Sequence, residues 1–171
     1  MDYAKLKIGD EAPEIICTLI EIPRGSKNKY EFDLKYEVIR LDRVLHSSVY
    51  YPGEYGLVPE TISEDGDPAD ILVIMTTETF PGCLIKVRPI GLLKMIDSGH
   101  NDNKILAVAY NDPAYQEVKN YADLPSHLLK QIVNFFETYK ILEGKEIKIL
   151  GWEDAAAAKE YIKTVHDKYL E

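Results

Sequence analysis

The chain has 171 residues, of which 46% are hydrophobic and 29% charged, an ordinary globular composition that allows one domain with a sizeable core. Its formal net charge of −9 argues against electrostatic binding to nucleic acid or to an anionic membrane. No stretch approaches the roughly 18 apolar residues of a membrane span, and "MDYAKLKIGDEAPE" lacks the apolar core of a signal peptide. We therefore expect a single domain over residues 1–171, located in the cytoplasm.

The first two thirds of the chain have the residue patterns of β-strands. Apolar or alternating segments occupy residues 15–22, 29–45, 71–76, 84–97 and 103–110. Turn residues bound most of these segments, and Pro89-Ile90-Gly91 interrupts the long segment 84–97. Cys17 and Cys83 lie in apolar surroundings, so we expect both to be buried free thiols rather than a disulfide.

The last third of the chain has helical periodicity. Residues 125–142 repeat apolar side chains at helical spacing, with Pro125 near the start and Gly144 after the end. A short strand at 146–153 precedes an alanine-rich helix at 154–170, for which Asp154 is a plausible N-cap. Many short strands followed by two helices predict an α+β protein, and the strands are too short and numerous for a flat open sheet. A closed or nearly closed β-barrel is expected.

Three aspartates crowd the segment Asp65-Gly66-Asp67-Pro68-Ala69-Asp70. A turn alone would explain the Asp-Gly and Asp-Pro pairs. The same bend would also let the three carboxylates converge, and a divalent cation such as Mg²⁺ or Mn²⁺ would relieve their repulsion. The spacing does not fit an EF-hand loop, and the four histidines lack the paired spacing of a zinc site.

Further polar residues flank other predicted turns and strand ends. The groups near Glu21 and near Asp97 also fit solvated hairpins, and the tyrosines of "YYPGEYG" also fit an aromatic core patch. Together, however, carboxylates with Lys, Arg and Tyr side chains are typical of a site for a metal-bridged polyphosphate. The set comprises Glu21, Lys29, Glu31, Arg43, Tyr50, Tyr51, Tyr55, Asp97, Asp102, Lys104 and Lys140.

The sequence resembles the family I soluble inorganic pyrophosphatases, especially the short prokaryotic type, from about residue 10 to the C-terminal helix. The most specific match is the spacing of the three aspartates in residues 65–70. Supporting segments follow in the family's order: "EIPRGSKNKYE", "LDR", "YPGEYG", "VRPIGLLKMID", "FFETYK" and "GWEDAAAA". The resemblance implies a five-stranded OB-like barrel with peripheral strands and two α-helices. It also implies Mg²⁺-dependent hydrolysis of pyrophosphate to two phosphates, with several cations per site, and a homo-oligomer that is commonly a hexamer.

The resemblance further implies roles for individual residues. Asp67 would contact the attacking water, while Tyr55 and Lys104 would orient the water network and the neighbouring carboxylates; Tyr51 would mainly pack. The substrate would be bound by Lys29, Arg43, Tyr139 and Lys140. The cations would be held by Asp65, Asp67, Asp70, Asp97, Asp102, Glu21 and Glu31.

Three residues depart from the family pattern. Ala69 replaces a larger aliphatic residue, Ser98 replaces a common Glu, and Glu54 replaces a common Asn. Ser98 would weaken the substrate-linked cations, and Glu54 would place an extra charge near the entrance, so that Glu54→Asn would lower the KM. Two other hypotheses stay open: a non-catalytic OB-type module that binds a nucleotide or nucleic acid, and a catalytically impaired pyrophosphatase relative. The first would need a basic groove with stacking aromatics, whereas carboxylates dominate these loops.

Overall fold

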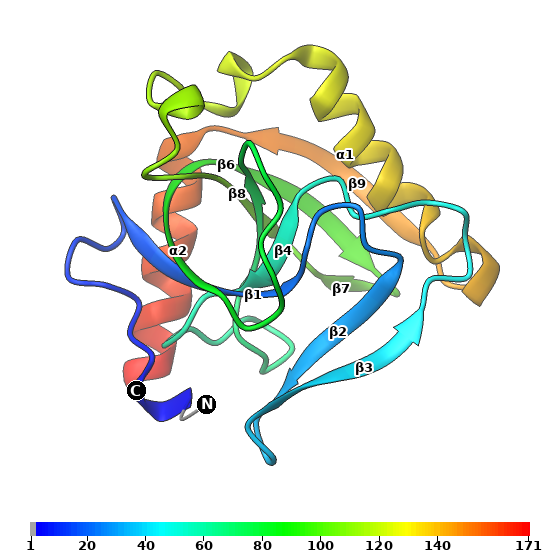
Figure 1. Cartoon of the computed structure of the whole chain (residues 1–171), viewed down its shortest axis with the longest axis horizontal. Helices are drawn as coiled ribbons and strands as arrows, with labels where there is room; N and C mark the ends of the chain where they lie inside the picture. Colours follow the sequence, from blue (N-terminus) through cyan, green and yellow to red (C-terminus); the bar gives the residue numbers. More distant parts are fainter. Residues whose placement is uncertain (1–2) are drawn as a thin grey trace.

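The computed structural model of the chain describes residues 3–171. Its centre is a ring of strands, visible in Figure 1, which the strand pairing closes with five members. The pairing runs from β1 to β4, β5, β8 and β6 and then returns to β1. The β5–β8 pair is parallel, and the other pairs of the ring are antiparallel. The ring confirms the predicted α+β class and closed strand arrangement. Its strands are β1 (Ile16–Ile22), β4 (Glu54–Leu57), β5 (Asp70–Ile74), β6 (Leu84–Asp97) and β8 (Lys104–Ala109).

The long strand β6 joins the ring to the rest of the sheet. It pairs with β1, β8, the short β7 (His100–Asn101) and β9 (Ile147–Glu153). The interruption predicted at Pro89-Ile90-Gly91 is a shift in the β6–β8 register between Pro89 and Gly91, not a break in the strand. Because an irregularity of this kind bends a strand, β6 can serve both the ring and its extension.

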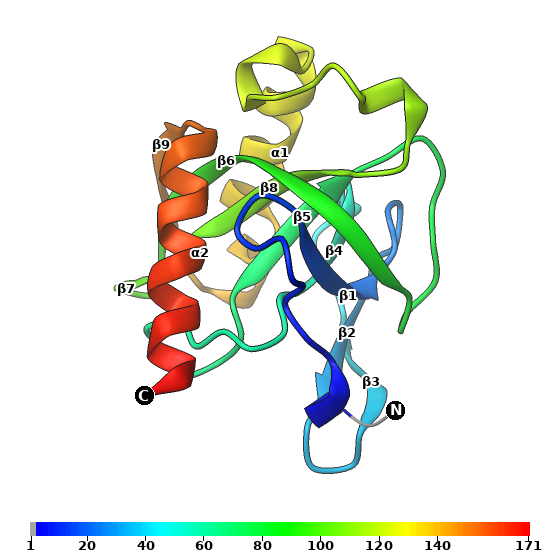
Figure 2. The same ribbon diagram turned by 90° about the vertical axis from the view of Figure 1, so that its left-hand side faces the viewer.

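A separate hairpin of β2 (Asn28–Asp33) and β3 (Val38–Val44) projects from the ring (Figure 2). Two helices flank the ring: α1 (Ser126–Thr138) lies against β9, and α2 (Ala155–Leu170) lies against β6. Asp154 caps α2 as predicted, because its Oδ1 accepts a hydrogen bond from Ala157 N at 2.9 Å. In the part of the chain that the structure describes, four 3₁₀-helices complete the fold: η1 (Tyr3–Lys5), η2 (Pro113–Tyr115), η3 (Tyr121–Asp123) and η4 (Ile141–Glu143).

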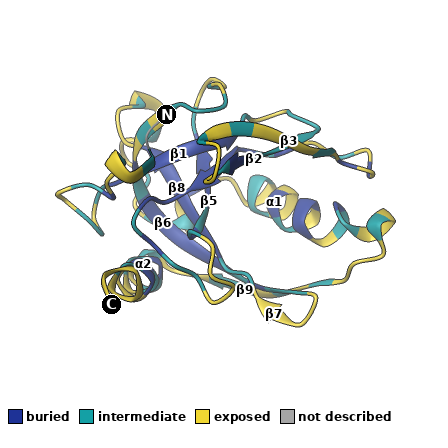
Figure 3. Ribbon diagram, turned by 90° about the horizontal axis from the view of Figure 1, so that it is seen from below, coloured by how far each residue is buried: buried dark blue, intermediate teal, exposed yellow. Residues whose placement is uncertain are grey.

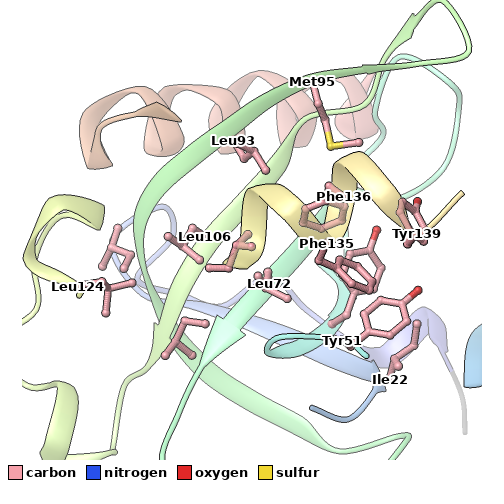
Figure 4. Packing of buried hydrophobic residues seen from close by; sticks show 14 of the residues in the cluster. Ile22, Tyr51, Leu72, Leu93, Met95, Leu106, Leu124, Phe135, Phe136 and Tyr139 are labelled. Atoms are coloured by element: carbon pink, nitrogen blue, oxygen red, sulfur yellow. The ribbon is translucent and has the colours of Figure 1, made fainter. Parts of the chain in front are cut away.

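The strand ring separates the two larger apolar cores, and buried residues follow its strands (Figure 3). One core lies under α1 and is rich in aromatic rings (Figure 4). In this core the ring of Tyr51 is 4.7 Å from that of Phe135 and 5.4 Å from that of Tyr55. Tyr51 is only 2% exposed, so it packs as expected. The other core lies under α2 and includes Ala158 and Ile162. A third, small cluster lies between β1, β2 and β4 and consists of Leu19, Phe32 and Leu57.

The cysteines were only partly predicted. Cys17 and Cys83 are both free, but both are half-buried rather than buried. Cys17 is the one residue of β1 that is not buried, and Cys83 directly precedes β6 in a turn. Within residues 3–171, no helix has the length and apolar character needed to cross a membrane.

Candidate active site

A cavity of about 380 Å³ lies where the β2–β3 hairpin, the β6–β8 connection, the end of α1 and the segment before β5 meet. We call residues 59–69, which precede β5, the aspartate loop. The cavity is lined by seven carboxylates: Glu21, Glu31, Asp65, Asp67, Asp70, Asp97 and Asp102. Its other lining residues are Lys29, Lys104, Lys140, Lys145, Tyr30, Tyr55, Tyr139, Ser98, His100 and Asn101.

The cavity brings together every residue to which the resemblance gives a catalytic, substrate or cation role except Arg43; Tyr50 and Tyr51 of the wider candidate set also lie outside it. Arg43 lies on β3 directly across from Lys29 on β2, but its guanidinium is held by other carboxylates. Its Nε donates to Glu143 Oε1 at 3.0 Å and its NH1 donates to Asp42 Oδ2 at 2.5 Å. Binding of substrate by Arg43 therefore stays a prediction, and it would require a change of partners.

Lys104 is the most buried cation of the cavity, with 3% exposure. It is the first residue of β8, and its Nζ donates to Asp70 Oδ2 and to Asp102 Oδ1, each at 2.5 Å. Burial alone would lower the pKa of Lys104, but the charges of Asp70 and Asp102 raise it well above its usual value. Lys104 is therefore a permanent cation that fixes two carboxylates.

Asp67 lies at the exposed tip of the aspartate loop. Gly66 has φ +94°, and Asp67 N donates to Asp65 Oδ1 at 3.1 Å, so the segment forms the predicted turn. Partial burial raises the pKa of Asp67, and the nearby charges of Asp65 and Asp70 raise it further. The turn and the crowding of carboxylates thus occur together.

Glu21 forms the buried wall of the cavity on β1. Its Oε1 accepts a hydrogen bond from Phe32 N at 2.6 Å, which ties the ring to β2. Burial raises the pKa of Glu21 to about 8, although the hydrogen bond from Phe32 opposes this shift. Without additional positive charge nearby, ionisation of Glu21 is therefore costly.

The other cavity lysines also have carboxylate partners, with one exception. Lys29 Nζ donates to Glu31, and Lys140 Nζ donates to Asp97. Lys145 makes no side-chain ion pair or hydrogen bond with any residue in 3–171. Sequence reasoning missed Lys145, His100 and Asn101, which lie outside the quoted family segments, and it gave no role to Tyr30, which lies inside one of them.

Glu54 corrects one expectation. It is 1% exposed and does not line the cavity, so the predicted extra charge at the entrance is wrong. Its carboxylate accepts hydrogen bonds from Arg24 N at 3.0 Å and from Thr79 N and Oγ1 at 3.2 and 2.5 Å. Glu54 therefore joins the loop that contains Arg24 to the loop that contains Thr79, which is a structural role.

The other two departures from the family pattern are Ala69 and Ser98. Ala69 is fully buried in the α2 core, and its N donates to Thr61 Oγ1 at 2.8 Å. Ser98 lines the cavity, and its Oγ donates to Asp97 Oδ1 at 2.8 Å. A hydroxyl thus occupies the position of the family's usual carboxylate and contacts a predicted cation ligand.

The donor set fits a hard divalent cation by its chemistry. Carboxylate oxygens surround the cavity, and Mg²⁺ prefers such oxygen ligands. Within residues 3–171, however, no three Asp, Glu, His or Cys side chains are close enough together to hold a metal ion. The aspartates therefore line one cavity without forming a compact set of metal ligands, and Lys104 forms ion pairs with Asp70 and Asp102.

Comparison with known proteins identifies the family of the chain. Residues 18–170 match the sequence profile of the family described as inorganic pyrophosphatase. The chain is 45% identical over 161 residues to an inorganic pyrophosphatase of Picrophilus torridus, covering 94% of this chain and 91% of the relative. It is 53% identical over 157 residues to one from Synechocystis, covering 92% of each.

Solved structures give the same result for the fold. The crystal structure of inorganic pyrophosphatase from Thermus thermophilus superposes with a TM-score of 0.97 and 41% identity, and the match covers 100% of both chains. A second structure, an inorganic pyrophosphatase from Helicobacter pylori, superposes with a TM-score of 0.93 and 37% identity over 98% of this chain and 99% of that one. The chain therefore belongs to the inorganic pyrophosphatase family.

Proposed function

We propose that the protein hydrolyses inorganic pyrophosphate to two phosphates, with Mg²⁺ as its cofactor. The observation that carries this proposal is one cavity lined by seven carboxylates and four lysines, in a chain whose family match spans residues 18–170. A nucleic-acid-binding module is not favoured, because its groove would be basic and the family assignment is to an enzyme.

The carboxylates are proposed to bind several cations, with Mn²⁺ as a possible substitute. Asp65, Asp70 and Asp102 would hold the first, and Asp97 with Asp102 would hold another that arrives with substrate; Glu21 and Glu31 would complete the acidic wall. Bound Mg²⁺ supplies positive charge that neutralises pyrophosphate and makes water more acidic.

The side chains of the protein would then position the reactants and move one proton. Asp67 would accept a proton from the attacking water, and bound cations would keep its carboxyl group ionised for this role. Lys29, Lys140 and the Tyr139 hydroxyl would hold phosphate oxygens and stabilise the charge of the leaving phosphate. Lys104 would keep Asp70 and Asp102 in place.

The Tyr55 hydroxyl would orient the water network from the buried side of the cavity, where the ring of Tyr55 packs among aromatic residues. Arg43 would join the phosphate ligands if substrate displaced Glu143. No covalent intermediate on the enzyme is needed, because water attacks phosphorus directly.

We also propose that residues 1–171 form one pyrophosphatase domain and that the chain assembles as a homo-oligomer, a hexamer by family resemblance, in the cytoplasm. The two free cysteines are compatible with a reducing compartment. The alternative of an impaired enzyme rests on Ser98 alone, since Glu54 lies away from the cavity.

Asp67→Asn provides the decisive test. It removes the proposed base while it keeps the shape of the side chain, so Mg²⁺-dependent phosphate release should fall by about 10²-fold or more. The matched control is Asp167→Asn on α2, an exposed position whose side chain makes no hydrogen bond within residues 3–171. Near-normal release by a folded Asp67→Asn protein would remove Asp67 from its role, and no release by the wild type would refute the proposed function.

A further inference from the structure

Two of the proposed cation ligands lie at the tip of the aspartate loop, beyond the hydrogen bonds that close its base. Asp65 and Asp67 are exposed at the tip. The base of the loop is closed by Thr61, whose Oγ1 donates to Val58 O at 2.6 Å and accepts from Ala69 N at 2.8 Å. This closure fixes the two ends of the loop but not the position of its tip.

The C-terminal helix α2 supports the first half of the loop through backbone contacts. His166 Nδ1 lies 2.6 Å from Glu60 O, so the ring donates a hydrogen bond to that carbonyl. Ile62 N donates to Val165 O at 2.8 Å. Two successive helix residues thus hold two loop residues.

A second set of contacts reaches the turn that contains the aspartates. Ser63 Oγ and Tyr161 Oη are 3.2 Å apart, and Lys168 Nζ donates to Ser63 O. Ser63 in turn closes the aspartate turn, because Ser63 N donates to Asp67 O at 2.8 Å. A continuous chain of hydrogen bonds therefore leads from Tyr161 through Ser63 to the backbone of Asp67.

The helix itself is well anchored. Ala158, Ile162 and Val165 are buried in the core that α2 shares with the ring, and α2 packs against β6. β6 also pairs with β8, and Lys104 is the first residue of β8. Through α2 and β6, the aspartate loop is therefore held in a fixed position relative to the buried Lys104.

We propose that α2 is the positioning element of the cation site, and that Tyr161 and His166 are positioning residues that hold Asp65 and Asp67 in place relative to Asp70. This inference rests on the proposed function, since it concerns the same cations. Neither residue lines the cavity. Without these hydrogen bonds the loop must be ordered when a cation binds, and that entropy cost weakens binding.

The test measures cation binding directly, by calorimetric titration of the full-length protein with Mn²⁺ in the absence of substrate. His166→Leu removes the donor to Glu60 O, and Mn²⁺ affinity should fall roughly tenfold, which is equivalent to ordering about one more backbone residue on binding. His166→Gln keeps an N–H donor and should restore most of the affinity. Tyr161→Phe keeps the ring and loses only the hydroxyl, so it should weaken binding in the same direction.

The control is Tyr169→Phe, which removes a hydroxyl from the same helix at a position with no side-chain hydrogen bond within residues 3–171. In phosphate release, the Mg²⁺ concentration at half-maximal rate should rise for His166→Leu and Tyr161→Phe, while kcat at saturating Mg²⁺ changes less than about twofold. A purely structural role would lower Tm and leave Mn²⁺ affinity unchanged.

Wild-type Mn²⁺ affinity in both His166→Leu and Tyr161→Phe would overturn the inference. Failure of the proposed function would give a different result. If His166→Leu and Tyr161→Phe bind Mn²⁺ more weakly than the wild type but the wild type releases no phosphate, only hydrolysis is refuted. A wild-type protein that binds no Mn²⁺ would refute both.

Discussion

Glu21 and Glu54 are both buried carboxylates on the strand ring, yet only Glu21 faces the cavity. Glu54 accepts three hydrogen bonds, whereas Glu21 accepts one from the backbone of Phe32. A fully satisfied buried carboxylate holds structure together, and an under-satisfied one facing a cavity has free oxygens for a ligand.

Glu54→Ala tests the structural role. The change leaves the N–H groups of Arg24 and Thr79 without their acceptor, so unfolding in urea should require about 2–4 kcal/mol less free energy. KM for magnesium pyrophosphate should stay within about twofold of wild type, because the residue lies outside the cavity. Glu117→Ala, at an exposed position, serves as control. A changed KM with unchanged stability would contradict this role.

Glu21 should make stability depend on pH when cations are removed with EDTA. Its pKa is about 8 in the folded protein and about 4.5 when unfolded, so the folded state retains a proton that the unfolded state has lost. The free energy of unfolding should therefore fall as pH rises from 4.5 to 8, by at most about 1.4 kcal/mol per pH unit from this group. Glu21→Gln should flatten the dependence; equal slopes in both proteins would contradict it.

At the level of single residues, the sequence predicted which carboxylates line the cavity, but it did not predict which side chains pair with one another. The motif spacing identified every carboxylate of the cavity, because each lies in a short segment with a recognisable order. It did not foresee that Arg43 pairs with Glu143, which lies 100 positions away along the chain. Local sequence carries no information on which of several acidic residues folding will bring to one guanidinium.

Among the elements, α1, α2 and the long strands were predicted because their periodicity is local. The strand β4 was missed since its four residues, Glu54–Leu57, are all buried and show no alternation. β4 lies between β1 and β5 in the ring. Without it, the sequence predicted a closed barrel but not which strands pair to close it. A short strand in a Gly-rich aromatic segment is recognised only from its neighbours.

Gly56 of β4 marks a close approach of two strands. A Cβ there would lie 2.0 Å from Leu19 O, a backbone atom of β1 that cannot move without breaking the ring. Gly56→Ala should therefore lower the free energy of unfolding by about 3 kcal/mol or more, or prevent soluble expression. Gly144→Ala, where φ is +70° but no atom lies within 4 Å, should lose only about 1 kcal/mol. Similar losses in the two variants would refute the close-approach argument.

At the scale of the whole molecule, the cavity joins parts of the chain that are far apart in sequence. It gathers residues from Glu21 to Lys145 around one concentration of negative charge. A ligand that binds the folded state alone stabilises it by linkage. Cations that bind here should therefore stabilise the entire fold.

Addition of Mg²⁺ should raise Tm in a saturable way, by an amount equivalent to about 2.7 kcal/mol at a hundredfold excess over Kd. NaCl of matched ionic strength controls for screening and should raise Tm less. Asp67→Asn should reduce the Mg²⁺-dependent shift. Equal effects of both salts would mean that the carboxylates repel one another without forming a specific site.

The parallel pairing of β5 with β8 determines when the site can form during synthesis of the chain. The register aligns Ile71 with Ile105, so the residues that begin the two strands, Asp70 and Lys104, start at the same edge. During synthesis the aspartates leave the ribosome more than thirty residues before their buried counter-charge. A nascent chain that ends short of β8 keeps unrelieved repulsion where the finished enzyme has an ion pair, and it has no means of performing the reaction until the later strand docks.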